Sequence, residues 1–102
     1  MTAVDPTPDL RGLVSANREA ILRLARAHRG TAVRVFGSVA RGDASESSDI
    51  DFLVDFEPGS SLFDVLHLSA DLRDLLGVDV DVVSSGGLKP RDTHIRREAV
   101  EL

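Results

Sequence analysis

Two short β-rich runs on either side of a long helical pattern constrain this fold more than any other feature. "DIDFLVDF" precedes the helical pattern, and "VDVDVV", in which apolar and acidic residues alternate, follows it. Between them, "LFDVLHLSADLRDLLG" repeats large apolar residues at helical spacing up to Gly77, a residue type that commonly ends helices. We therefore predict strands near 49–56 and 78–83 joined by a helix.

The segments outside this unit complete a small α+β pattern. Upstream, apolar residues at helical spacing predict a helix over about 8–29, and "TAVRVF" predicts a strand near 32–36. Downstream, we expect a short last helix from about Thr93 to Val100. The order helix, strand, strand, helix, strand, helix suits a small mixed three-stranded sheet with helices packed on one face.

Length, composition and charge limit the classes of function. The chain has 102 residues, of which 42% are hydrophobic and 28% charged, as expected for one globular core. We predict a flexible tail at 1–6 and a single domain over 7–102. A formal charge of -5 disfavours non-specific capture of nucleic acid, and the absence of cysteine excludes disulfides and thiolate chemistry.

Targeting signals also bear on where the protein works. The sequence contains no apolar run of membrane-spanning length, and its first residues lack the basic start and apolar core of a signal peptide. We therefore expect a cytoplasmic protein that acts neither on a membrane nor directly on nucleic acid.

The acidic residues of the two runs are the first candidates for a functional site. Side chains alternate along a strand, so Asp49 and Asp51 face the same way. Two nearby carboxylates repel each other unless a cation compensates, and oxygen ligands suit Mg²⁺ or Mn²⁺. Either Asp79 or Asp81 could add a third carboxylate, and such a cluster is typical of two-metal phosphoryl transfer. The alternative is that these aspartates are solvated charges at strand ends.

The Gly37-Ser38 pair favours the metal-site interpretation. It directly follows the first predicted strand, where a glycine lets the backbone approach a ligand closely. The N–H groups and the hydroxyl that come next can hold phosphate oxygens at a helix start. The segment "GSVARGD" is not a P-loop, because Asp43 occupies the position that requires lysine.

These residues together resemble a known family. Gly37-Ser38, ten further residues and then Asp49-Ile50-Asp51 are similar to the G-S-x10-D-x-D signature of the DNA polymerase β-type nucleotidyltransferase superfamily. The ending "LLGVDVDVVSSGGLKPRDTHIRREAVEL" resembles its minimal nucleotidyltransferase (MNT) subgroup. The resemblance runs from about Val33 to Leu102, and it implies a fold like the polymerase β palm.

The resemblance also implies a role for each residue of the signature. The expected nucleotide-binding residues are Gly37, Ser38 and Arg41. The expected catalytic residues and ligands of two Mg²⁺ ions, or of Mn²⁺, are Asp49, Asp51 and Asp81. Asp79 stands where a basic or neutral residue is expected, so the choice between Asp79 and Asp81 as the third carboxylate stays open.

The MNT resemblance further implies a partner and a reaction. Minimal proteins of this kind resemble the antitoxins of HEPN/MNT toxin–antitoxin pairs. In these type VII-like systems the antitoxin transfers AMP from ATP to a tyrosine of the HEPN-domain toxin. The chain itself contains no tyrosine, so it cannot modify itself in this way. The alternative is a catalytically silent antitoxin that blocks its toxin sterically. Transfer to a small-molecule hydroxyl, a third option, usually needs a further substrate domain.

Overall fold

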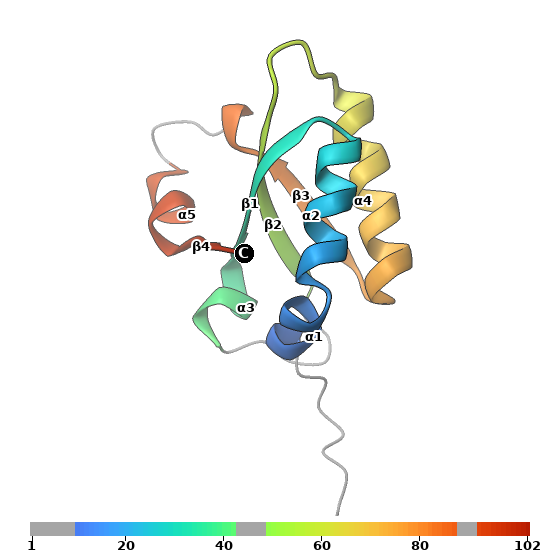
Figure 1. The fold of residues 1–102 in the computed structure, drawn as a ribbon. Coiled ribbons are helices and arrows are strands. Elements are labelled where there is room, and N and C mark those ends of the chain that lie inside the picture. The colour runs from blue at the N-terminus through green and yellow to red at the C-terminus, as the bar shows by residue number, and fades with distance from the viewer. Residues whose placement is uncertain (1–9, 43–48, 88–91) are drawn as a thin grey trace, which may run out of the picture.

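The computed structural model describes residues 10–42, 49–87 and 92–102, and a four-stranded sheet forms its centre (Figure 1). The strands, in the spatial order β3-β2-β1-β4, are β1 (Gly30–Phe36), β2 (Ile50–Phe56), β3 (Val80–Ser84) and β4 (Val100–Glu101). β1 is antiparallel to both of its neighbours, whereas β2 and β3 are parallel. The predicted mixed α+β fold is confirmed, with one strand more than the three that were expected.

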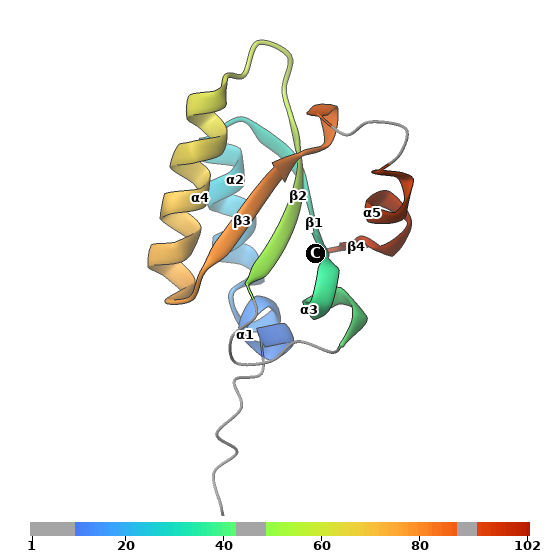
Figure 2. The ribbon, with the colours of Figure 1, turned by 180° about the vertical axis from the view of Figure 1, so that it is seen from behind.

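Five helices surround this sheet in the described ranges. They are α1 (Leu10–Ala16), α2 (Arg18–Ala27), α3 (Gly37–Arg41), α4 (Leu62–Leu76) and α5 (Thr93–Glu98), and Ser85–Gly87 form a 3₁₀ turn, η1. The prediction of helices packed on one face of the sheet holds for α2 and α4, which lie side by side on that face. α5 lies on the other side of the sheet (Figures 1 and 2). None of the helices in these ranges is long and apolar enough to span a membrane.

β2 supplies the centre of the hydrophobic core with one of its faces. Ile50, Phe52 and Val54 alternate along the strand and are fully buried, in one cluster with Leu68 and Leu72 of α4. Burial of each such side chain contributes about 1.5–3 kcal/mol. Because side chains alternate, the intervening residues of β2 point away from this core and are free to form a polar site.

α4 forms where the sequence predicts it and is capped at both ends. The backbone N–H of Ser61 donates to the carboxylate of Asp64 at 2.9 Å, which satisfies a donor at the helix start and places a negative charge in the first turn. Gly77 ends the helix with φ of 70°, and its N–H donates to the Arg73 carbonyl at 2.8 Å. The prediction that Gly77 stops this helix is confirmed.

The prediction of a single helix over 8–29 is wrong. The described residues of this range form two helices, α1 and α2. Asn17 separates the two, and its side-chain amide donates to the Leu13 carbonyl at 2.8 Å. Asparagine competes in this way for backbone groups that would otherwise continue a helix. The break lets α1 lie near α3 while α2 packs on the sheet. The predicted helix start and the tail at 1–6 lie outside the described residues.

The last helix is shorter than predicted, and its end supplies the unexpected strand. α5 stops at Glu98, Ala99 is extended, and the next two residues pair with β1, Val100 opposite Val35 and Glu101 opposite Arg34. A two-residue strand produces no recognisable alternation in a sequence. The helical expectation up to Val100 is therefore wrong for Ala99 and Val100, the second of which pairs in the sheet.

Candidate functional site

The parallel pairing of β2 and β3 brings two predicted carboxylates together. Asp51 is the register partner of Asp81, and partners on neighbouring strands point to the same side of a sheet. Asp49 comes just before β2, is exposed, and is close enough for its charge to act on Asp51. Asp51 and Asp81 therefore lie together at one end of the sheet, on the face opposite the core, and the charge of Asp49 acts on Asp51 from just before the strand.

The structure separates the two candidates for the third carboxylate. Asp79 lies before β3, and its carbonyl accepts a hydrogen bond from the N–H of Ile50 at 3.0 Å. Asp79 therefore lies two residues before Asp81 and is not the register partner of Asp51. Asp81 is both that partner and the carboxylate with the largest charge effect on Asp51. Geometry thus favours Asp81 over Asp79.

The carboxylate of Asp51 lies in an unfavourable environment for a negative charge. Burial, followed by the charges of Asp81 and Asp49, raises its pKa above the ordinary 3.8, and Arg41 only partly opposes this shift. Burial and like charges both disfavour ionisation. A carboxylate in such surroundings favours a proton or a nearby cation, and its role as a metal ligand stays a prediction.

Gly37 lies directly against this carboxylate. Phe36, the last residue of β1, is the register partner of Asp51, so the chain leaving β1 turns beside the Asp51 side chain. Gly37 has φ of 72°, and a Cβ atom at this position would collide with the Asp51 carboxylate oxygen Oδ2. Only glycine adopts this positive φ without strain and also leaves room for the Asp51 carboxylate. Ser38 follows in α3, so the predicted phosphate cradle borders the carboxylates.

Arg41, at the end of α3, lies between two acidic groups. Its Nη1 is 3.3 Å from Oε2 of Glu98 on α5, and its positive charge lowers the pKa of Asp51. The guanidinium is half-exposed. This position is compatible with the predicted support of a nucleotide triphosphate.

A second polar group on the same face was missed by the sequence analysis. Arg34 Nη1 lies 3.2 Å from Oδ1 of Asp55, and a hydrogen bond from Ser85, followed by the effect of Arg34, keeps the pKa of Asp55 below 3.8. Leu53, fully buried, separates this pair from Asp51 along β2. The detectable signal was an arginine in the middle of a predicted strand, opposite a strand rich in aspartate.

This second group leads to a prediction about pH. Because the pKa of Asp55 is lower in the folded than in the unfolded chain, its contribution to stability is present above pH 3.8 and is lost as the pH falls through the folded-state value. We expect Asp55→Asn to destabilise the protein at neutral pH by less than about 1 kcal/mol, since the pair is partly exposed. Thermal unfolding should show the difference shrinking below about pH 4. A difference that grows on acidification would contradict the assigned cause.

The donor set of the site fits a magnesium ion. In the described part of the chain, no three His, Asp or Glu side chains are grouped so that they could hold a metal by themselves. Mg²⁺ does not need such a cage, because it is usually bound through one or two carboxylates, with water and substrate phosphates as the other ligands. The Asp51–Asp81 pair beside Gly37 offers that arrangement.

Comparison with known proteins identifies the family. Residues 18–101, which are more than half of the chain, match the model of the nucleotidyltransferase domain. The chain therefore belongs to the nucleotidyltransferase domain family. The class of enzyme predicted from the signature is confirmed, and the match begins in α2, upstream of the segment where the signature was recognised.

Individual relatives agree with this assignment. The chain is 42% identical to a provisionally assigned protein adenylyltransferase of Methanocaldococcus jannaschii over 67% of this chain and 74% of the relative. It is 49% identical to the protein adenylyltransferase MntA of Thermococcus cleftensis, over 56% of this chain and 58% of MntA. A solved structure described as a provisional minimal nucleotidyltransferase has 50% identity and a TM-score of 0.82, covering 90% of this chain and 95% of that one.

More distant solved structures share the fold. One is a tri-AMPylated Shewanella oneidensis HEPN toxin in complex with an MNT antitoxin, with a TM-score of 0.66 and 20% identity over 85% of this chain and 69% of that one. At this identity the likeness concerns the fold alone. It confirms that the architecture is that of a minimal nucleotidyltransferase domain.

Proposed function

We propose that this chain transfers AMP from ATP to a hydroxyl, in particular that of a tyrosine, on a partner HEPN-domain toxin. In doing so it would act as the antitoxin of a type VII-like pair. The observation that supports this most directly is the register pairing of Asp51 with Asp81 beside the Gly37 turn. A protein that only binds its partner has no need of carboxylates that repel each other at a partly buried position.

The proposed reaction is a displacement at the α-phosphorus of ATP. The acceptor oxygen forms a bond to this phosphorus, while the bond to the oxygen that bridges to the β-phosphate breaks and pyrophosphate leaves. The hydroxyl proton must be removed in the same step, and in this proposal Asp81 either accepts it or completes the metal ligand set. The products are an AMP ester of the acceptor and pyrophosphate.

The other residues of the signature would hold the reactants. In this proposal Asp49, Asp51 and Asp81 hold one or two Mg²⁺ ions, or Mn²⁺, whose positive charge offsets that of the carboxylates and phosphates. Gly37 and Ser38 border the β- and γ-phosphates, and the Arg41 guanidinium is close enough to add positive charge beside them.

The partner is proposed from the family resemblance and from the named relatives. The 49% identical relative is named as a protein adenylyltransferase, so its acceptor is a protein. The chain has no tyrosine, so any tyrosine acceptor lies outside it.

The deciding experiment measures the intact mass of a co-purified HEPN partner after incubation with this protein, ATP and Mg²⁺. We expect mass gains of whole AMP units on the partner, and none with the Asp49→Ala, Asp51→Ala double variant. Asp79→Ala is the matched control, because it removes an exposed carboxylate from the same end of the sheet without touching the register pair. It should retain transfer.

A stable complex without any mass gain would contradict the proposal and favour the catalytically silent antitoxin. Equal loss of transfer in Asp79→Ala and in the double variant would instead make Asp79, the other candidate for the third carboxylate, part of the site. Omitting Mg²⁺ and adding a chelator should abolish the mass gain in the unchanged protein.

A further inference from the structure

α3 contains the proposed phosphate cradle but is too short to hold its own position. It has five residues, and glycines with positive φ lie at both ends, Gly37 at 72° and Gly42 at 81°. Helices of one or two turns are only marginally stable without tertiary contacts. The contacts that α3 makes with the rest of the protein therefore decide where Gly37 and Ser38 lie.

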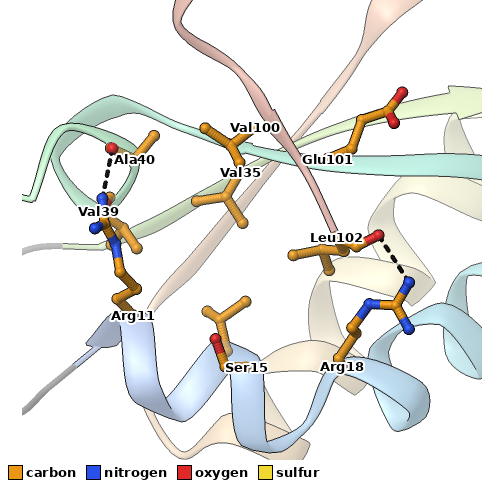
Figure 3. Close-up of a pocket in the computed structure, with 10 residues that line it drawn as sticks. Arg11, Ser15, Arg18, Val35, Val39, Ala40, Val100, Glu101 and Leu102 are labelled. Carbon is orange, nitrogen blue, oxygen red and sulfur yellow. Dashed lines mark hydrogen bonds between the residues drawn. The ribbon is translucent and has the colours of Figure 1, made fainter.

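One of these contacts is made by Arg11 of α1. Its Nη2 donates to the Ala40 carbonyl at 2.7 Å and to the Val39 carbonyl at 3.3 Å (Figure 3). The last carbonyls of a helix lack partners within the helix, and a positive charge there is favourable. Arg11 thus acts as a C-terminal cap for α3 that comes from a different helix.

α3 borders a cavity on the side that faces α1. The cavity, of ≈ 590 Å³, lies between α1, α3 and β4, and its lining includes Val35, Val39 and Val100 (Figure 3). Val39 of α3 is buried and belongs to the same core cluster as Val14 of α1, so apolar packing holds one side of this short helix. The Arg11 guanidinium adds a polar bridge from α1 to the last carbonyls of α3 at the rim of the cavity.

From these observations we infer that Arg11 is a positioning residue for nucleotide binding. It fixes the end of α3 and, through this short helix, the placement of Gly37 and Ser38 against Asp51. The inference rests on the proposed function, since it assumes that the Gly37-Ser38 turn receives the triphosphate. Arg11 itself need not touch ATP.

Arg18 provides a matched control at the rim of the same cavity. It is also an exposed arginine, and its Nη2 donates to one backbone carbonyl, that of Leu102, at 3.0 Å (Figure 3). This hydrogen bond leads to the end of β4 and not to α3. Loss of Arg18 therefore removes a comparable contact without loosening the cradle.

The test compares Arg11→Ala, Arg11→Lys and Arg18→Ala by the Kd of ATP with Mg²⁺, by kcat and KM of AMP transfer, and by Tm. For Arg11→Ala we expect Kd and KM to rise about tenfold with little change in kcat, as for one lost hydrogen bond from a charged group. Arg11→Lys should recover part of the affinity, because lysine can donate to only part of the carbonyl pair. Arg18→Ala should stay within about twofold at a similar loss of Tm.

The outcomes separate this inference from the proposed function. If the unchanged protein binds ATP and Arg11→Ala binds it equally well, or if both alanine variants weaken binding equally, the inference is wrong and the proposed function stands. If the unchanged protein does not bind ATP, both are wrong. Should Arg11→Ala fail to fold, Arg11→Lys decides, since an affinity equal to that of the unchanged protein would overturn the inference.

Discussion

Asp51→Asn is expected to abolish nucleotidyl transfer and at the same time to make the protein more stable at neutral pH. The substitution removes a carboxylate that the proposed reaction needs, and losses of about 10²–10⁴-fold are usual for groups that take part in catalysis. It also removes a partly buried charge that faces Asp81 and Asp49. We expect a gain of about 1 kcal/mol, or about 5 °C in Tm for a domain of this size.

The stability gain should depend on pH in a defined direction. The folded-state pKa of Asp51 lies above its ordinary value of 3.8, so the stability that goes with the protonated form is present below pH 3.8 and is lost as the pH rises through the folded-state value. Asparagine does not ionise and escapes this loss. The advantage of Asp51→Asn should therefore be full at pH 7, shrink as the pH falls through the folded-state pKa and be lost by about pH 3.8.

Thermal unfolding in the presence of a chelator measures this effect without interference from metal. Asp74→Asn is a suitable control, because Asp74 is an exposed aspartate on α4, and such substitutions usually change stability by less than about 0.5 kcal/mol. Combining Asp51→Asn with Asp81→Asn should give less than the sum of the two gains, because each relieves the same repulsion. A loss of stability in Asp51→Asn at pH 7 would contradict the assigned cause.

Gly37→Ala is expected to have the second largest effect. The new methyl group would occupy the space of the Asp51 carboxylate, and the positive φ at this position adds strain of about 1–2 kcal/mol. Relief requires Asp51 or the turn to move, and a misplacement of about 1 Å in a reacting group can reduce the rate about 10²-fold. We therefore expect loss of both stability and AMP transfer, measured by Tm and by kcat/KM.

Gly77→Ala separates backbone strain from collision. Gly77 has nearly the same φ, 70°, and a Cβ atom there meets no other atom within 4 Å. This control should lose stability through strain alone and should keep its transfer rate. If Gly37→Ala loses no more activity than Gly77→Ala, the contact between Gly37 and Asp51 has no role in the reaction.

The sequence predicted the main elements of the fold because their signals are long. The stripe of α4, the Gly77 stop and the alternation of β2 each span several residues that agree with one another. Asn17 is a single residue inside a helical pattern, and β4 has only two residues. Features of this length depend on tertiary contacts that a local pattern does not contain.

The candidate site could be predicted in part for a similar reason. The signature singled out Gly37, Asp49 and Asp51, whose roles stay predictions, and only the strand register distinguishes Asp81 from Asp79. Two carboxylates four residues apart on the same face of β2 also have pKa values shifted in opposite directions. The pKa of Asp51 is raised and that of Asp55 is lowered, because one meets carboxylates and the other meets Ser85 and Arg34. Only the fold specifies these neighbours.

The parallel pairing of β2 with β3 also determines when the site can form during synthesis. A parallel pair needs a crossover, so β3 can join β2 only after α4 has folded back along the sheet. The antiparallel pairing of β1 with β2 requires no part of the chain beyond Phe56. A nascent chain can therefore pair β1 with β2 before Asp51 and Asp81 come close enough to repel each other. The repulsion arises only when β3 joins the sheet, and by then the packing of α4 is available to outweigh it.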